Sequence, residues 1–173
     1  MRTHMLARLA VVLTIVGTVG CDRVTKHVAR STLAGTPERS FLADSLRLMY
    51  VENTGGFLSL GANLPPEVRT ALFTVATGLI LLGLTAFALR CRWTGPPAFG
   101  LTVFLAGGVS NWFDRVMHGS VVDFVNIGIG PFRTGVFNVA DVAIMLGVAI
   151  VVTSEFRRAP QVEPPPGDSG AAA

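Results

Sequence analysis

A long uncharged stretch in the middle of the chain restricts its possible folds more than any other feature. Residues 70–89 read TALFTVATGLILLGLTAFAL and contain no Asp, Glu, Lys or Arg. A helix rises about 1.5 Å per residue, so about 20 apolar residues are needed to cross the roughly 30 Å hydrocarbon layer of a bilayer. The stretch therefore predicts a transmembrane helix.

Three further apolar segments extend this prediction to a helical membrane domain. They cover approximately residues 5–21, 98–113 and 136–152. The composition agrees, because 50% of the residues are hydrophobic and only 14% are charged, whereas soluble domains carry about 25% charged residues. We expect an all-α membrane fold with four transmembrane helices, in a single domain over residues 1–155.

The segment between the first two expected helices has a different character. Residues 40–62 combine alternating apolar residues with a Gly pair, which predicts one or two β-strands around a turn. At the other end of the chain, residues 156–173 are rich in Pro and small residues. Such a segment cannot bury enough apolar area to fold, so we expect a disordered tail.

The number of helices and one short basic turn predict the sidedness of the chain. Four spanning helices place both termini on the same side of the membrane. Residues 90–92 form a short turn with two arginines, and short basic turns stay in the cytoplasm. We therefore expect cytoplasmic termini and an extracytoplasmic β-segment.

The N-terminal segment has a competing interpretation. A basic start, an apolar stretch and the sequence TVGC, which ends at Cys21, are typical of a secretory signal peptide with a lipoprotein cleavage box. Thr18 stands where such boxes carry a Leu-like residue, and three later apolar segments make a removable leader less necessary. We expect a retained helix. The only other cysteine, Cys91, forms no CxxC pair with Cys21 and is interpreted as a plain loop residue.

Polar residues collect at the expected outer ends of the helices. Ionisable groups at membrane depth cost several kcal/mol unless they are paired or face a cavity, so each is a candidate functional residue. Spacings of three and four residues place several of them on common helical faces. A structural interpretation comes first for these residues. Asp22 with Lys26 is expected to be a local ion pair, and Asp114 with Arg115 an ion pair or the end of a helix. Asn111 and Asn138 are expected to form interhelical hydrogen bonds.

Two aspartates are not explained by local pairing. Neither Asp123 nor Asp141 has a Lys or Arg within four positions. If the two acids meet in a site of low dielectric constant, they cannot both ionise, and one pKa rises. The ionised carboxylate can then take a proton from an attacking water while the protonated one donates to a carbonyl oxygen. This chemistry hydrolyses an amide without a metal or cofactor.

Other chemistries find less support in the sequence. No GxSxG motif and no HxxxH spacing occurs. The formal net charge of +3 is small and scattered, which argues against a nucleic-acid partner. Two alternatives stay open. One is a proton-coupled small transporter, although transporter acids tend to lie near mid-bilayer. The other is a metal-dependent membrane hydrolase with the ligands Asp114, His118, Asp123 and Asp141.

Five polar blocks, in order and over approximately residues 5–155, resemble the lipoprotein signal peptidases (signal peptidase II) of bacteria. The blocks are DRVTK, ENTGGFLSLG, GGVSNWFDR, GSVVDF and FNVADVAI. Two residues depart from the family pattern: Arg23 replaces the usual Gln, and Ser110 replaces the Gly that precedes Asn. Neither departure affects a candidate acid.

The resemblance implies four transmembrane helices and a small extracytoplasmic β-cradle in the bacterial inner membrane. It implies cleavage of diacylglyceryl-modified prolipoproteins before the lipidated cysteine, with these substrates and membrane lipid as partners and with no cofactor. Asp123 and Asp141 would be the catalytic pair, and Gly55 and Gly56 would let the cradle close. The residues implied to line or support the site are Asn53, Asn111, Arg115, Asn138, Asp22, Lys26 and Gly55.

Overall fold

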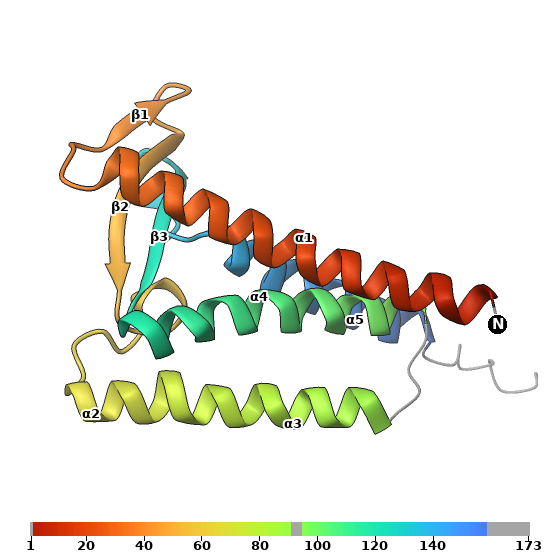
Figure 1. Cartoon of the computed structure of the whole chain (residues 1–173). Helices are drawn as coiled ribbons and strands as arrows, with labels where there is room; N and C mark the ends of the chain where they lie inside the picture. Colours follow the sequence, from red (N-terminus) through yellow and green to blue (C-terminus); the bar gives the residue numbers. More distant parts are fainter. Residues whose placement is uncertain (1, 91–94, 159–173) are drawn as a thin grey trace, which may run out of the picture.

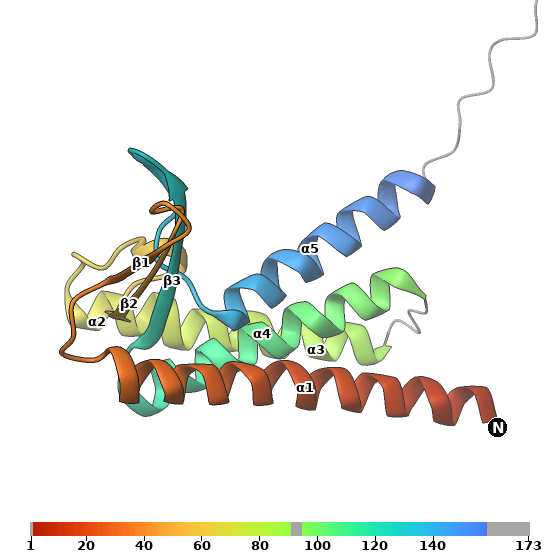
Figure 2. The same ribbon diagram turned by 90° about the horizontal axis from the view of Figure 1, so that it is seen from above.

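The computed structural model describes residues 2–90 and 95–158, so the predictions for Cys91, the turn at 91–92 and the tail at 159–173 lie outside the described residues. Helices run along one another, and a small sheet crosses one end of them (Figure 1). The helical elements are α1 (Arg2–Leu33), the short η1 (Phe57–Ser59), the run of α2 (Pro66–Arg69), η2 (Thr70–Ala76) and α3 (Thr77–Arg90), then α4 (Pro96–His118) and α5 (Val139–Arg158). Seen from above, α5 diverges from the other helices as it leaves the sheet (Figure 2).

The four predicted helical segments are present, but their ends differ from the prediction. α1 continues past residue 21 to Leu33, because Asp22 and Lys26 neutralise each other within the helix instead of ending it. α4 begins at Pro96, where the missing N–H of proline costs no hydrogen bond. α5 reaches Arg158, so the tail does not begin at residue 156 as predicted.

The sheet contains two strands that the sequence analysis missed. Its four strands are antiparallel in the order β1-β2-β3-β4, namely Arg39–Phe41, Leu46–Asn53, Val121–Ile129 and Phe132–Arg133. β1 and β2 lie at the predicted place, whereas β3 and β4 come from the segment between α4 and α5. β3 pairs with β2 so that Asp123 lies opposite Val51. One catalytic candidate is therefore held on a strand.

The burial pattern of the described residues is the reverse of that of a soluble protein. Polar and charged residues outnumber apolar ones in the buried interior, while many large apolar side chains on the helices are exposed. Exposed apolar helix surfaces with polar contacts between the helices suit a lipid surrounding. In the part of the chain that the structure describes, two helical runs are long and apolar enough to cross a membrane, Pro66–Arg90 and Val139–Arg157. Four such helices were predicted.

Small residues bring α4 and α5 into close contact. A Cβ atom added at Gly107 of α4 would lie 2.5 Å from the carbonyl oxygen of Ala140, and one at Gly147 of α5 would lie 2.6 Å from that of Gly100. Glycines at these positions let the two backbones approach, as is common between membrane helices. The approach brings Asn111 next to Asp141.

Candidate active site

The two candidate acids converge from different elements on a single asparagine. Asp123 lies on β3, Asp141 lies in the first turn of α5, and both side chains are buried. The side-chain amide of Asn138 donates to Oδ1 of Asp123 at 2.6 Å. The backbone N–H of Asn138 donates to Oδ2 of Asp141 at 3.1 Å, and the N–H of Asp141 donates back to Oδ1 of Asn138 at 3.0 Å.

The reciprocal bonds between Asn138 and Asp141 form a capping box at the start of α5. Asn138 immediately precedes α5, and Asp141 is the third residue of α5. At this spacing the side chain of each residue can accept a hydrogen bond from the backbone N–H of the other. The box orients both side chains through local sequence alone. The spacing was noted in the sequence, but its capping role was not recognised.

Amide donors from two further elements complete the surroundings of the carboxylates. Asn53, at the end of β2, donates from Nδ2 to Oδ2 of Asp123 at 2.8 Å. Asn111, on α4, donates from Nδ2 to Oδ1 of Asp141 at 2.9 Å. Each carboxyl group thus accepts two N–H bonds from neutral groups. These donors hold an ionised carboxylate in place without forming an ion pair that would stop it from taking up a proton.

Burial changes the acidity of Asp123, which lies outside the helices. Removal from water raises its pKa from 3.8 to about 6, and the negative charge of Asp141 acts in the same direction. Hydrogen bonds from Asn53 and Asn138 and the positive charge of Lys26 lower this pKa and offset part of the increase. Arg115 also interacts electrostatically with Asp123. A carboxyl with a pKa near 6 can exchange protons close to neutral pH, as a general acid or base must.

This raised pKa predicts that Asp123→Asn stabilises the folded protein at pH 8. The folded state holds the proton of Asp123 more tightly, so folding is penalised once the pH exceeds the ordinary value of 3.8, and the penalty is complete above about 6. Removing the charge should raise the free energy of unfolding by about 2–3 kcal/mol at pH 8 and change it little near pH 4. Thermal melting in detergent at both pH values measures the difference.

Asp44→Asn is the matched control for this prediction, because its effect should have the opposite sign. Arg47 and Ser40 donate hydrogen bonds that hold the pKa of Asp44 below its ordinary value. An Asp with a lowered pKa stabilises the folded state when ionised, so its removal should lower the melting temperature at pH 8. Equal melting temperatures of Asp123→Asn and the parent protein at pH 8 would contradict the burial argument.

A buried charge network lies behind Asn111. Nζ of Lys26 lies 2.7 Å from each of three oxygens, on Asp22, Asp114 and Asn111. This confirms the predicted pair of Asp22 with Lys26. Asp22 also accepts the backbone N–H of Ala140, at the start of α5, at 2.9 Å. The network therefore ties α1 to both helices that carry the site.

Asp114 and Arg115 do not form the local ion pair that was predicted. Consecutive residues of a helix point in directions about 100° apart, and here they face different neighbours. Asp114 binds Lys26 and Arg23 of α1. Arg115 donates to the carbonyl oxygen of Gly55 at 2.6 Å and to that of Asn111. Arg115 thus links α4 to the loop that follows β2.

The loop after β2 packs too tightly at Gly55 for any side chain. A Cβ atom there would lie 2.5 Å from the carbonyl oxygen of Leu60. The N–H of Gly55 donates to Oδ1 of Asn53 at 2.9 Å, which fixes the amide whose other end contacts Asp123. The close approach requires a glycine at position 55. Its N–H holds the side chain of Asn53, and its carbonyl oxygen accepts the hydrogen bond from Arg115.

The two departures from the family pattern contact each other. Arg23 donates to the carbonyl oxygen of Ser110, and the hydroxyl of Ser110 donates to Asp22 at 2.7 Å. The sequence did not place Arg23 or Ser110 among the candidate site residues. It placed Asp114 there only as a possible metal ligand. The sequence contains one indication of the buried charge network: Lys26 is the only lysine, whereas every other permanently cationic side chain is an arginine.

The structure offers no set of ligands for the metal-dependent alternative. Within residues 2–90 and 95–158, no three His, Cys, Asp or Glu side chains are grouped so that they could hold a metal ion. Asp114 faces Lys26 and Arg23, whereas Asp123 and Asp141 face asparagine amides. His118 lies exposed at the end of α4.

Comparisons with known proteins identify the family of the chain. Residues 14–157 match the family model described as signal peptidase (SPase) II. The lipoprotein signal peptidase of Desulforapulum autotrophicum is 34% identical over 153 residues, covering 88% of this chain and 93% of that protein. Those of Sphingopyxis alaskensis and Vibrio parahaemolyticus are 35% and 31% identical, covering 76% and 77% of this chain and 76% and 79% of those proteins.

Two solved structures share the fold. Both are described as bacterial membrane enzymes, with TM-scores of 0.75 and 0.74 at 23% and 24% identity. The match covers 89% of this chain and 94% of the first structure, and 86% and 93% for the second. The family match covers most of the chain and includes every candidate residue of the site. The chain is therefore a membrane protein of the signal peptidase II family, the peptidases that cleave signal peptides from prolipoproteins.

Proposed function

We propose that this peptidase is an aspartic endopeptidase that acts on diacylglyceryl-modified prolipoproteins and cleaves before the lipidated cysteine. The observation that carries the proposal is the convergence of two buried carboxyl groups, Asp123 and Asp141, on the amide of Asn138. The family relationship supports the substrate class and does not favour the metal-dependent or transporter alternatives.

In the proposed mechanism the two carboxyl groups share one proton. The ionised carboxylate takes a proton from water as the water oxygen attacks the scissile carbonyl carbon. The protonated carboxyl donates to the carbonyl oxygen, which gives a neutral tetrahedral diol. Collapse of the diol breaks the C–N bond: the first carboxyl gives its proton to the leaving amine, and the second, now ionised, takes a proton from one diol hydroxyl. The products are an amine and a carboxylic acid, and the two carboxyl groups again share one proton. No covalent intermediate with the enzyme forms.

The other site residues have positioning roles in this proposal. Asn53, Asn111 and Asn138 orient the carboxylates through their amide donors. Asp22 and Lys26 hold Asn111 and the start of α5. Arg115 and Gly55 anchor the loop that carries Asn53. These roles follow from contacts with the acids or with their direct neighbours.

We further propose four membrane-spanning helices in one peptidase domain, with cytoplasmic termini and the sheet outside the cytoplasm. The exposed apolar surfaces of α1 and α4 support a lipid surrounding for these helices as well as for the two long apolar runs. The sheet lies at one end of the helices, so the carboxylates stand near a membrane interface in this arrangement (Figure 1). A lipid-anchored peptide would present its modified cysteine at that depth.

Purified protein should cleave a diacylglyceryl-modified prolipoprotein immediately before the modified cysteine. The two products should be the free signal peptide and a lipoprotein that begins with this cysteine. The reaction should proceed equally with and without a chelator, because the proposed chemistry needs no metal. Mass spectrometry of both products locates the cleaved bond. The matched control is the same prolipoprotein without the diacylglyceryl group, which should stay intact. Cleavage at another bond, or loss of cleavage with chelator, would contradict the proposal.

A further inference from the structure

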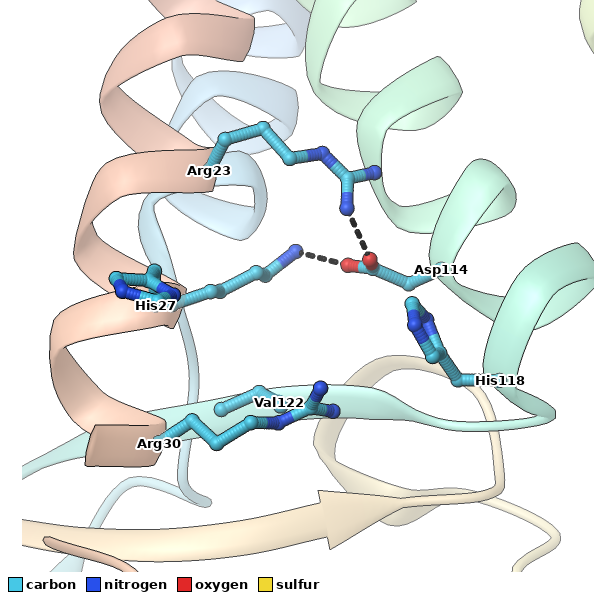
Figure 3. Close-up of a pocket in the computed structure, with 7 residues that line it drawn as sticks. Arg23, His27, Arg30, Asp114, His118 and Val122 are labelled. Atoms are coloured by element: carbon cyan, nitrogen blue, oxygen red, sulfur yellow. Dashed lines mark hydrogen bonds and ion pairs between the residues drawn. The ribbon is translucent and has the colours of Figure 1, made fainter.

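A basic pocket lies beside the charge network, and of its lining residues only Lys26 has a role in the proposed catalysis. It has a volume of about 310 Å³ and lies between α1, α4 and β3. Arg23, Lys26, His27 and Arg30 form one stripe on α1, at spacings of three and four residues. His118 reaches the pocket from the last turn of α4, on the opposite wall (Figure 3).

Some of the basic groups in the pocket are already used, and others are available. The three donor positions of Lys26 are taken by Asp22, Asn111 and Asp114. Arg23 binds Asp114 and the carbonyl oxygen of Ser110. Three further nitrogen-bearing side chains on the walls are exposed and make no ion pair within the part of the chain that the structure describes: His27, Arg30 and His118.

The charge balance of the pocket favours an anion. Asp114 is the only carboxylate among the described residues that line it, and both Arg23 and Lys26 neutralise it. Arg30 contacts the hydroxyl of Tyr50, which donates to the nearby Glu52 at 2.6 Å. The guanidinium of Arg30 therefore keeps donors for a ligand. An anion would gain charge-assisted hydrogen bonds, which are the stronger class.

Exposed apolar residues flank this basic pocket on both helices. Val24 and Val28 of α1 and Phe113 and Met117 of α4 are exposed, at 63%, 50%, 46% and 60%. The Phe113 ring lies 4.6 Å from the guanidinium of Arg23, which places the apolar surface directly against the basic one. A cationic pocket with an apolar border matches a ligand that has an anionic head and hydrocarbon chains.

We propose that this pocket binds the phosphate group of an anionic membrane phospholipid. Arg30, His27 and His118 would donate to the phosphate oxygens, and the acyl chains would lie along the flanking apolar residues of α1 and α4. Bound lipid would bridge α1 and α4 next to the network that supports the site, and would stabilise the folded protein by mass action. The proposal does not depend on the reaction that the protein catalyses.

Native mass spectrometry of detergent-solubilised protein with phosphatidylglycerol or phosphatidylcholine tests the proposal. The parent protein should retain phosphatidylglycerol in preference to phosphatidylcholine. Arg30→Gln and His118→Gln should each weaken this retention roughly tenfold, the loss expected for one charge-assisted hydrogen bond. Arg39→Gln is the matched control, because Arg39 is exposed on β1 outside the pocket. It should bind like the parent protein.

Three outcomes would overturn the proposal. Equal retention of the two lipids would exclude an anionic headgroup site. Unchanged phosphatidylglycerol binding in both variants would place any lipid site elsewhere. If glycerol 3-phosphate raised the melting temperature as much as phosphatidylglycerol does, the pocket would take a soluble phosphate instead of a lipid. Melting in phosphatidylcholine nanodiscs should be equal for all variants, and cleavage activity should be retained, which separates this test from that of the proposed function.

Discussion

Asp141→Asn is expected to lower the rate of prolipoprotein cleavage by roughly 10⁴-fold or more, the scale seen when one member of a cooperating catalytic set is removed. The proposed mechanism needs one carboxylate and one carboxyl in the same transition state, and asparagine can serve as neither general base nor general acid. The variant should still fold, because an asparagine oxygen can accept one of the two N–H bonds that Asp141 accepts, and losing the other costs only about 1–3 kcal/mol. Single-turnover kinetics with excess enzyme measure the chemical step directly.

Three comparisons make this prediction specific. Asp123→Asn should cause a loss of the same order, and the double variant should be no worse than either single one, because the two acids act as a unit. Asp44→Asn makes the same chemical change in the exposed turn between β1 and β2 and should retain activity. Near-normal turnover by Asp141→Asn, with the protein folded, would mean that the two acids are not the catalytic pair.

Lys26→Met is expected to destabilise the protein by about 3–5 kcal/mol, the usual cost of removing one partner from a buried ion pair. Methionine fills much of the volume of the lysine stem but leaves Asp22 without its cation, and Asp22 is 0% exposed. Asn111 would lose the 2.7 Å bond from Lys26 to its oxygen and keep only the 3.3 Å bond from Asn138, so its amide would be held less firmly against Asp141. Both the melting temperature and kcat should therefore fall.

A double-mutant cycle separates the charge effect from the loss of packing. Lys26→Met combined with Asp22→Asn should cost less than the sum of the two single changes, because the second change removes the uncompensated charge. Arg157→Met, at the exposed end of α5, should leave stability nearly unchanged. Additive losses in the cycle, with a small effect of Lys26→Met alone, would show that the buried network contributes little.

The features predicted from sequence are those that depend only on residues close together in the chain. The run at 70–89 is apolar over the length of a bilayer, and it lies within the helical run Pro66–Arg90. The carboxyl pair was predicted because Asp123 and Asp141 lack a local counter-charge, which is also a short-range property. The capping box of Asn138 and Asp141 also has a local signal, its spacing of three residues, although its capping role was not recognised from the sequence.

Long-range pairing accounts for what the prediction missed. β3 was not predicted because β2, the strand with which it forms most of its residue pairs, lies far away in the chain. α1 was predicted to end near residue 21 because Asp22 and Lys26 look like the end of an apolar helix. They continue the helix because Asp114 and Asn111 of α4 complete the partners of Lys26.

The amino-acid sequence alone determined that the chain belongs in a lipid bilayer and that two of its acids need partners from elsewhere. Both conclusions rest on which residue types occur within one helical length. The family resemblance placed Asn53, Asn111 and Asn138 near the site, but only the tertiary structure showed which carboxyl group each amide contacts. It also showed that Arg115 turns away from Asp114. Helical spacing specifies which residues share a face, but the packed neighbour determines what that face contacts.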